Sequence, residues 1–161
     1  AMLPDYVGPG NAYARLAALH EKAGQPAQVA ADLAKLVAHA ETEYDARLRL
    51  ADLQGKLGNA AAEAETLQGA LWVWPFDPAL HARLAALYAG LGRWPQAVRE
   101  RRAVVALAPV DRAEALYQLA QALYQSGDAT SARREVLHAL EAAPSFEKAQ
   151  ALLLKLQGDT R

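Results

Sequence analysis

The stretch that decides the fold is residues 113–146, AEALYQLAQALYQSGDATSARREVLHALEAAPSF. Apolar residues recur three and four positions apart on both sides of a Ser-Gly-Asp turn, which is the spacing of one helix face. Gly127 ends the first predicted helix and Pro144 follows the second. Because a helical hairpin this short cannot bury its apolar face alone, the chain should contain further copies that pack against it.

Glycine and proline return at a fixed interval along the chain. The turn glycines lie 34, 34 and 35 residues apart, at Gly24, Gly58, Gly92 and Gly127. Three prolines each follow 17 residues after a turn glycine, at Pro75, Pro109 and Pro144. A constant interval of this length is typical of repeat proteins, so it predicts four hairpins of one kind.

The period and the order of small and large residues resemble the tetratricopeptide repeat, whose outline is W-x2-L-G-x2-Y, then A-x3-F, then A and P. The last copy matches this outline at Leu116, Leu119, Ala120, Leu123, Ala132, Val136, Ala139 and Pro144. The first copy departs from it, with Glu41 where proline is expected. The resemblance covers residues 10–157 and implies an all-α fold: a right-handed superhelical solenoid of four helix-turn-helix repeats plus a C-terminal capping helix.

The expected domain organisation follows from these periods. Residues 1–9 are expected to form a leader or linker, and 158–161 a tail. A single solenoid domain at 10–157 would hold repeats at 10–43, 44–77, 78–111 and 113–146 and a capping helix at 147–157. Small residues at one repeated position, Ala17, Ala51, Ala85 and Ala120, should let the two helices of each hairpin approach closely.

Composition excludes several classes of function. The formal net charge of −1 argues against nucleic-acid binding through bulk charge. No apolar run approaches the roughly 20 residues that span a bilayer, so no membrane insertion is expected. The absence of cysteine excludes disulfides and thiolate metal sites and leaves the bacterial cytoplasm and periplasm equally open. The composition is typical of a bacterial protein, and the opening Ala1-Met2 suggests a segment of a longer protein.

The first helices carry the candidate binding site, because in tetratricopeptide stacks these helices line the concave groove. Arg15, Arg49 and Arg83 occupy one position in three successive repeats, and stacking would place their guanidiniums in a row. Such a row suits a carboxylate-bearing partner, because the planar guanidinium binds carboxylates bidentately. The further predicted groove residues are Asn11, Asp45, Asp52, Glu114, Tyr117, Gln118, Gln121, Tyr124 and Gln125. An alternative of equal weight is that the arginines form salt bridges between repeats.

The family also includes co-chaperones that clamp a peptide's C-terminal carboxylate with a set of Lys, Asn and Arg. In this sequence only Arg83 agrees with that set, because Ala14, Ala18, Arg49 and Ala79 stand at the other clamp positions. The sequence therefore predicts a different mode of recognition from that clamp.

An unusual aromatic run, WVWPFDP, ends the second repeat. Trp72, Trp74 and Phe76 place more aromatic surface there than one turn normally buries. These side chains either pack within the stack, contact a neighbouring domain, or form an exposed docking patch. Packing within the stack is the favoured explanation.

Two charged residues fall at positions that should face the interior, Glu63 and Arg101. An unpaired buried charge is too costly to keep. The two residues could pair with each other. The favoured alternative is that Arg101 extends its head toward solvent and that the second repeat turns Ala62 or Ala64 inward.

No combination of residues predicts catalysis, a metal site or a cofactor. The four histidines fall at different repeat positions and lack metal-ligand spacing. The glycines are interpreted as helix ends, so no phosphate-binding loop is expected.

We therefore expect a non-catalytic scaffold that binds a protein or peptide, of acidic character, in the concave groove. One alternative is an accessory or docking domain of a larger enzyme of peptidase-like type, which a full-length reading frame with a catalytic domain upstream would support. Another is a self-associating module. Residues 1–77 carry a formal charge of −4 and residues 78–161 one of +3, which could favour head-to-tail contacts between stack ends.

Overall fold

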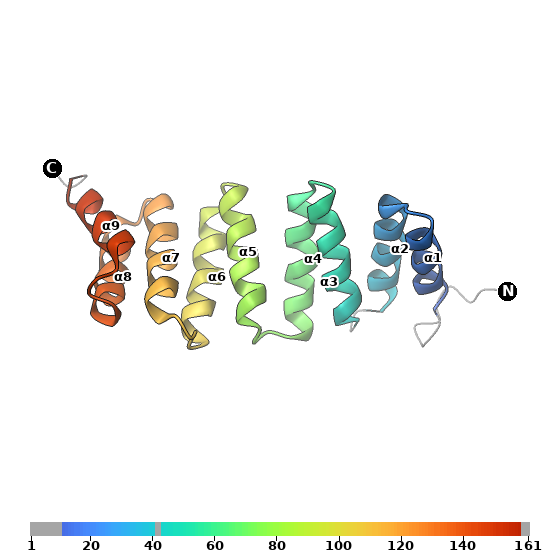
Figure 1. The fold of residues 1–161 in the computed structure, drawn as a ribbon, viewed down its shortest axis with the longest axis horizontal. Coiled ribbons are helices and arrows are strands. Elements are labelled where there is room, and N and C mark those ends of the chain that lie inside the picture. The colour runs from blue at the N-terminus through green and yellow to red at the C-terminus, as the bar shows by residue number, and fades with distance from the viewer. Residues whose placement is uncertain (1–10, 41–42, 159–161) are drawn as a thin grey trace. The chain divides into compact units, whose positions relative to one another are not determined.

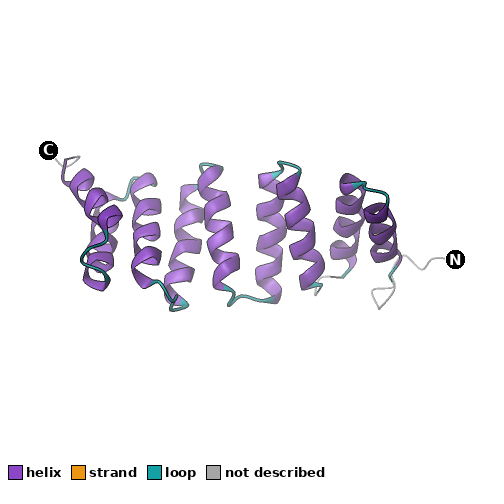
Figure 2. Ribbon diagram, in the orientation of Figure 1, coloured by secondary structure: helices purple, strands orange, loops and turns teal. Residues whose placement is uncertain are grey.

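The computed structural model describes residues 11–40 and 43–158 (Figure 1). Nine α-helices and no strand occur within those residues, so the all-α prediction is confirmed. Short loops join the helices, and within each hairpin the two helices run in opposite directions (Figure 2). The predicted leader at 1–9 and most of the predicted tail lie outside the described residues, whereas Gly158 is the last residue of the ninth helix.

The chain divides into two compact units, Ala1–Pro75 and Phe76–Arg161. The first unit holds two helical hairpins: α1 (Ala12–Lys22) with α2 (Pro26–His39), and α3 (Tyr44–Lys56) with α4 (Ala60–Val73). Helix α2 also packs on α3, which joins the two hairpins. Their shared core is aliphatic and includes Ala17, Val29, Leu33, Leu36 and Leu50.

The second unit holds five helices: α5 (Pro78–Gly90), α6 (Trp94–Ala106), α7 (Arg112–Gln125), α8 (Ala129–Ala142) and α9 (Glu147–Gly158). Helices α5 and α6 form one hairpin, α7 and α8 form the next, and α9 packs on α8 and α7. The core of this unit includes Leu116, Leu123, Val136, Ala149 and Leu156. That the two units form one continuous right-handed solenoid domain stays a prediction.

The repeated alanines lie where the two helices of each hairpin approach most closely. Ala17, Ala51, Ala85 and Ala120 are all completely buried. Each is on a first helix, and Ala132 on the second helix α8 is equally buried. A larger side chain at any of these positions would overpack the helix pair, at a cost of roughly 1–3 kcal/mol.

The turn glycines have the backbone conformation that the sequence predicts. Their φ angles are +68° at Gly24, +76° at Gly58, +69° at Gly92 and +89° at Gly127. At Gly92 the amide donates to the carbonyl of Ala89, and the next amide, of Arg93, donates to that of Tyr88. These bonds close the C-terminus of α5 and turn the chain into α6.

Not every glycine is a helix end, and in this respect the sequence interpretation was wrong. Gly55 lies inside α3 and Gly69 inside α4. A Cβ atom on Gly55 would lie 2.6 Å from Oε2 of Glu63, and one on Gly69 would lie 2.7 Å from Nη1 of Arg47. Both glycines therefore make room for a long charged side chain from the neighbouring helix.

The two interior charges are accommodated in different ways. Ala64 is completely buried, as the favoured alternative expected, but Glu63 is buried as well, against Gly55 of its own hairpin, so the expected shift does not remove the charge from the interior. Arg101 is only half-buried, so its side chain reaches solvent as expected. Its electrostatic neighbour is Glu114 of α7.

Substitution of two glycines near the end of α5 tests whether the chain turns at Gly92. Gly92→Ala should lower the free energy of unfolding by about 1 kcal/mol, because alanine is strained at positive φ. Gly90→Ala should raise it by about 0.5–1 kcal/mol, because Gly90 is helical and lacks that strain. A Cβ atom would meet nothing within 4 Å at either position, so packing does not confuse the comparison.

Urea denaturation of both variants, followed by circular dichroism, measures the two changes. Shifts of the same sign in both variants would contradict the turn assignment.

Candidate functional site

A pocket of about 190 Å³ opens between α5, α6 and α7, inside the second unit. Each of the three helices contributes part of its wall. The lining residues are Ala85, Ala89, Trp94, Ala97, Arg101, Gln118, Gln121, Ala122 and Gln125.

The sequence builds this pocket from two features of the repeat. Ala85 and Ala97, the small residues at the crossing of α5 and α6, are buried and leave space above them. Gln118, Gln121 and Gln125 are three and four residues apart, so their amides project from one face of α7. The result is a small-residue floor bordered by hydrogen-bonding groups.

Arg101 supplies the positive charge of the pocket. Burial lowers the pKa of its guanidinium, and the nearby Glu114 carboxylate opposes that shift. An arginine keeps its charge under such conditions, because its pKa starts far above neutrality. Glu114 also accepts a hydrogen bond from Nε2 of Gln118 over 2.5 Å and lies 3.8 Å from Nζ of Lys148. The pocket is thus cationic, with one carboxylate nearby that partly balances it.

The structure brings three of the predicted groove residues together and places two others elsewhere. Gln118, Gln121 and Gln125 share the pocket. Tyr117 instead packs edge-on against Phe146, with ring centroids 5.3 Å apart. The Nζ atom of Lys155 lies 4.8 Å from the ring centroid of Tyr124, on the side of the ring that faces α9.

In the first unit, one predicted arginine is engaged in a salt bridge between hairpins. Nη2 of Arg49 on α3 lies 2.6 Å from Oε2 of Glu21 on α1. This contact is an ion pair without hydrogen-bond geometry, since the buried Nη2 makes no hydrogen bond. Arg15 on α1 is exposed and has no side-chain partner within the described residues. Asp52 is exposed on α3, and Arg83 is half-buried on α5.

The aromatic run after α4 is exposed. Trp72 is 87% exposed, Trp74 60% and Phe76 73%. Packing within the stack, the favoured explanation from sequence, is therefore wrong for these three side chains. An exposed group of this kind is uncommon unless another molecule or domain covers it.

Two residues that line the pocket were not identified as site residues from sequence, Trp94 and Arg101. From the sequence, Trp94 is interpreted as an aromatic residue packed in the turn after Gly92. In the structure it is the first residue of α6 and lies half-buried at the pocket. Arg101 was noticed only as a charge at an interior position. The available signal was that a charged residue at an interior repeat position requires either a partner or an opening, and Arg101 has an opening.

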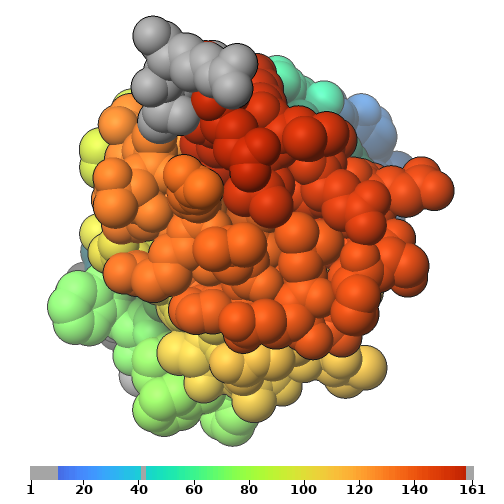
Figure 3. Space-filling model, turned by 90° about the vertical axis from the view of Figure 1, so that its left-hand side faces the viewer, coloured from blue at the N-terminus to red at the C-terminus, as the bar shows by residue number. Residues whose placement is uncertain are grey.

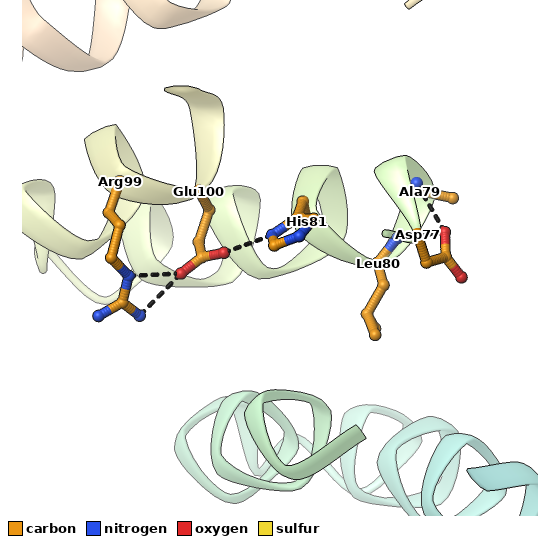
Figure 4. A network of polar contacts seen from close by, with 6 residues as sticks. All are labelled: Asp77, Ala79, Leu80, His81, Arg99 and Glu100. Carbon is orange, nitrogen blue, oxygen red and sulfur yellow. Dashed lines mark hydrogen bonds and ion pairs between the residues drawn. The ribbon is translucent and has the colours of Figure 1, made fainter. Parts of the chain in front are cut away.

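The strongest polar network of the second unit lies between α5 and α6 (Figure 4). Nδ1 of His81 is 2.7 Å from Oε2 of Glu100, and Nε of Arg99 donates to Oε1 of the same carboxylate over 2.8 Å. Glu100 is only 3% exposed and His81 9%. Asp77 caps the start of α5 by accepting from the amides of Ala79 and Leu80.

This network stabilises the hairpin and has no access for a substrate. A buried carboxylate is tolerable only when it is paired and hydrogen-bonded, and Glu100 meets both conditions. Burial also raises the pKa of Tyr88, whose hydroxyl lies close to the same Arg99. In the described part of the chain, no three His, Asp or Glu side chains converge to hold a metal ion.

Comparison with known proteins identifies the architecture. No family model and no curated protein matches the sequence. Solved structures do match: MamA from Desulfovibrio magneticus RS-1 has a TM-score of 0.66 at 19% identity, covering 92% of this chain and 83% of that one. A tetratricopeptide repeat protein from Parabacteroides merdae has a TM-score of 0.66 at 19% identity, covering 91% and 60%. The fold is that of tetratricopeptide-repeat proteins.

A third structure of this fold contains a bound peptide. The first tetratricopeptide domain of Spaghetti (RPAP3), bound to the HSP90 peptide SRMEEVD, has a TM-score of 0.60 at 18% identity, covering 73% of this chain and 93% of that one. In tetratricopeptide terms α5 and α7 are first helices and α6 and α8 are second helices. None of the described helices is both long and apolar enough to cross a membrane.

Glu100→Ala tests the network inside the third tetratricopeptide hairpin. The substitution leaves His81 and Arg99 without their shared acceptor, so it should lower the free energy of unfolding by about 3 kcal/mol. Glu135→Ala is the matched control, because Glu135 holds the same repeat position on α8 but contacts only Arg134 and His138 of its own helix. Its cost should be about 1 kcal/mol or less.

Thermal and urea unfolding of the two variants measure the difference. Equal losses would show that the interhelical contact adds nothing to the stability of the hairpin.

Proposed function

We propose that this chain is a protein-interaction module that binds a peptide segment, and that an acidic side chain of the segment enters the pocket between α5, α6 and α7. The observation that carries the proposal is the meeting of Arg101 with three glutamine amides in one opening. Small-molecule sites typically occupy about 300–1,000 Å³. The pocket, at about 190 Å³, is smaller than such a site, and its size suits a single side chain of a bound segment.

The chemistry of the lining supports recognition of a peptide backbone. Each glutamine amide offers both a donor and an acceptor, as a backbone peptide group requires. Gln121 and Gln125 are exposed at the rim and are available to such contacts. The indole of Trp94 adds an apolar wall for the stem of the entering side chain.

Charge supports an acidic segment over a neutral or basic one. Arg101 is half-buried, so a carboxylate that reaches it interacts in a less polar medium than water. Glu114 weakens this preference without removing it, because its carboxylate already accepts from Gln118 and lies toward Lys148. We therefore expect a moderate preference for Asp or Glu at one position of the bound segment.

The first unit carries a cationic candidate of its own. Arg15 is exposed and unpaired among the described residues, whereas Arg49 is held by Glu21. Of the predicted row of arginines, Arg15 is therefore the better candidate in this unit for a partner's carboxylate. The RPAP3 structure supports binding of a short peptide in general, because that domain has the same fold and is bound to the peptide SRMEEVD, which contains three acidic residues.

A second candidate function follows from the exposed aromatic run. Trp72, Trp74 and Phe76 would serve as the surface on which a catalytic domain of a larger enzyme docks. Their exposure supports this candidate, because aromatic residues are enriched in the centres of protein interfaces. A blue shift of tryptophan emission when such a domain is added would support it, and unchanged emission would count against it.

The pocket is tested by selecting short peptides from a random displayed library on the wild-type chain and measuring their affinity by fluorescence anisotropy. We expect the selected peptides to be enriched in Asp and Glu. Arg101→Gln should weaken their binding by about tenfold, equivalent to about 1.4 kcal/mol. Gln121→Ala should weaken binding of acidic and neutral peptides alike, because it contacts the backbone.

Arg102→Gln is the matched control, because Arg102 is the next residue on α6 and is exposed outside the pocket. It should leave the affinity unchanged. Equal losses in both arginine variants would show that general charge, and not the pocket, attracts the peptides. Selection of peptides without acidic residues would reject the proposed specificity.

A further inference from the structure

Helix α9 follows the four hairpins and is the last described helix. In each of the four hairpins, a second helix packs along the first: α2 along α1, α4 along α3, α6 along α5 and α8 along α7. Helix α9 packs on α8 and α7, but no further described helix packs along it. The place that α8 takes on α7 is thus uncovered on α9.

A groove of about 360 Å³ lies along α8 and is closed on one side by Leu156 of α9. Figure 3 looks onto this end of the second unit, where α8 and α9 face the viewer in orange and red. The groove is lined by Ala129, Thr130, Arg133, Arg134, Leu137 and Leu156.

The outer surface of this end is less polar than that of a terminal cap. A capping element of a repeat protein needs a polar outer face. Here Leu137 of α8 is 44% exposed in the groove and Leu154 of α9 is 68% exposed. The expectation that α9 is a simple solvating cap therefore does not account for these leucines.

Arginines border the apolar floor. Arg133 is exposed and has no hydrogen-bond or ion-pair partner within the described residues. Arg134 is 62% exposed on its side chain and contacts only the adjacent Glu135, at 2.9 Å. In a ligand whose apolar part covers Leu137, polar groups beside that part would lie within reach of the guanidiniums of Arg133 and Arg134.

We propose that this groove binds an amphipathic helix of a partner protein, with acidic residues on both sides of an apolar stripe. The helix would lie along the groove between α8 and α9. Its apolar residues would cover Leu137, and its carboxylates would meet Arg133 and Arg134. This interaction surface is separate from the pocket between α5, α6 and α7.

A second copy of the chain is a poorer occupant than a different protein. Helix-in-groove binding needs apolar residues that repeat along one exposed face. Among the described helices of this chain, each exposes at most one large apolar side chain, such as Leu19 on α1 or Trp72 on α4. Residues 11–40 and 43–158 therefore offer no exposed apolar stripe that could fill the groove.

Two synthetic helical peptides test the proposal. Both carry the same leucine stripe, one flanked by glutamates and the other by lysines, and both carry a fluorophore. Fluorescence anisotropy should show saturable binding of the acidic peptide and at least about tenfold weaker binding of the basic one. Arg133→Glu should reverse this preference, and Leu137→Asp should weaken the binding of both peptides.

Three control variants separate this site from general effects. Arg112→Glu changes an exposed arginine on α7, and Leu19→Asp changes an exposed leucine on α1. Arg101→Gln alters the pocket of the proposed function. All three should leave binding of the acidic peptide unchanged, and circular dichroism should show the same helicity in every variant.

Several results would overturn the proposal. They are equal affinity for the two peptides, no saturable binding of either, or the same loss in the control variants. Concentration-dependent dimerisation that Leu137→Asp abolishes would identify a second copy as the occupant and would also reject a partner helix.

Discussion

The close approach of paired helices at alanine is the constraint on which the rest of the structure depends. Ala17, Ala51, Ala85 and Ala120 are completely buried, one on the first helix of each hairpin. Helices that close leave little space for long side chains between them, so Gly55 and Gly69 are needed where Glu63 and Arg47 extend across a helix surface. The same small residues make the floor of the pocket, because Ala85 and Ala97 leave volume that Trp94 and the glutamines border but do not fill.

A second regularity is polar and lies at the eighth residue after each turn glycine. Asp32, Thr66 and Glu100 hold this position on α2, α4 and α6, and each bonds a side chain of its own hairpin's first helix. The partners are His20, Gln54 and His81, at distances of 2.6, 2.8 and 2.7 Å. In the fourth hairpin Glu135 bonds only along its own helix. Polar links of this kind fix which helix faces meet, whereas aliphatic contacts tolerate rotation.

The sequence predicted the features that depend on residue size and backbone conformation. Alanine at a fixed position and glycine at a fixed interval each have one dominant structural role, so that role can be inferred from the sequence alone. Arg101 and Trp94 were harder to interpret, because a large residue at an interior position is explained equally well by packing, by a partner or by an opening. Trp72 was equally hard to interpret. Its apolar surface favours burial, but burial requires a neighbouring group that its own repeat does not supply. Tyr117 and Tyr124 contact Phe146 and Lys155 of the C-terminal segment, and a repeat-by-repeat alignment has no information on that contact.

Because each of these polar links joins the two helices of one hairpin, duplication of a hairpin copies both partners of the link together. A gene that gains or loses one 34-residue unit keeps both partners of the link together and needs no compensating change in another unit. Apolar contacts between hairpins are less specific, so a copied unit can adapt to a new neighbour by small substitutions. The position of His81 and Glu100 within one hairpin thus makes the repeat a unit of evolutionary copying as well as of packing.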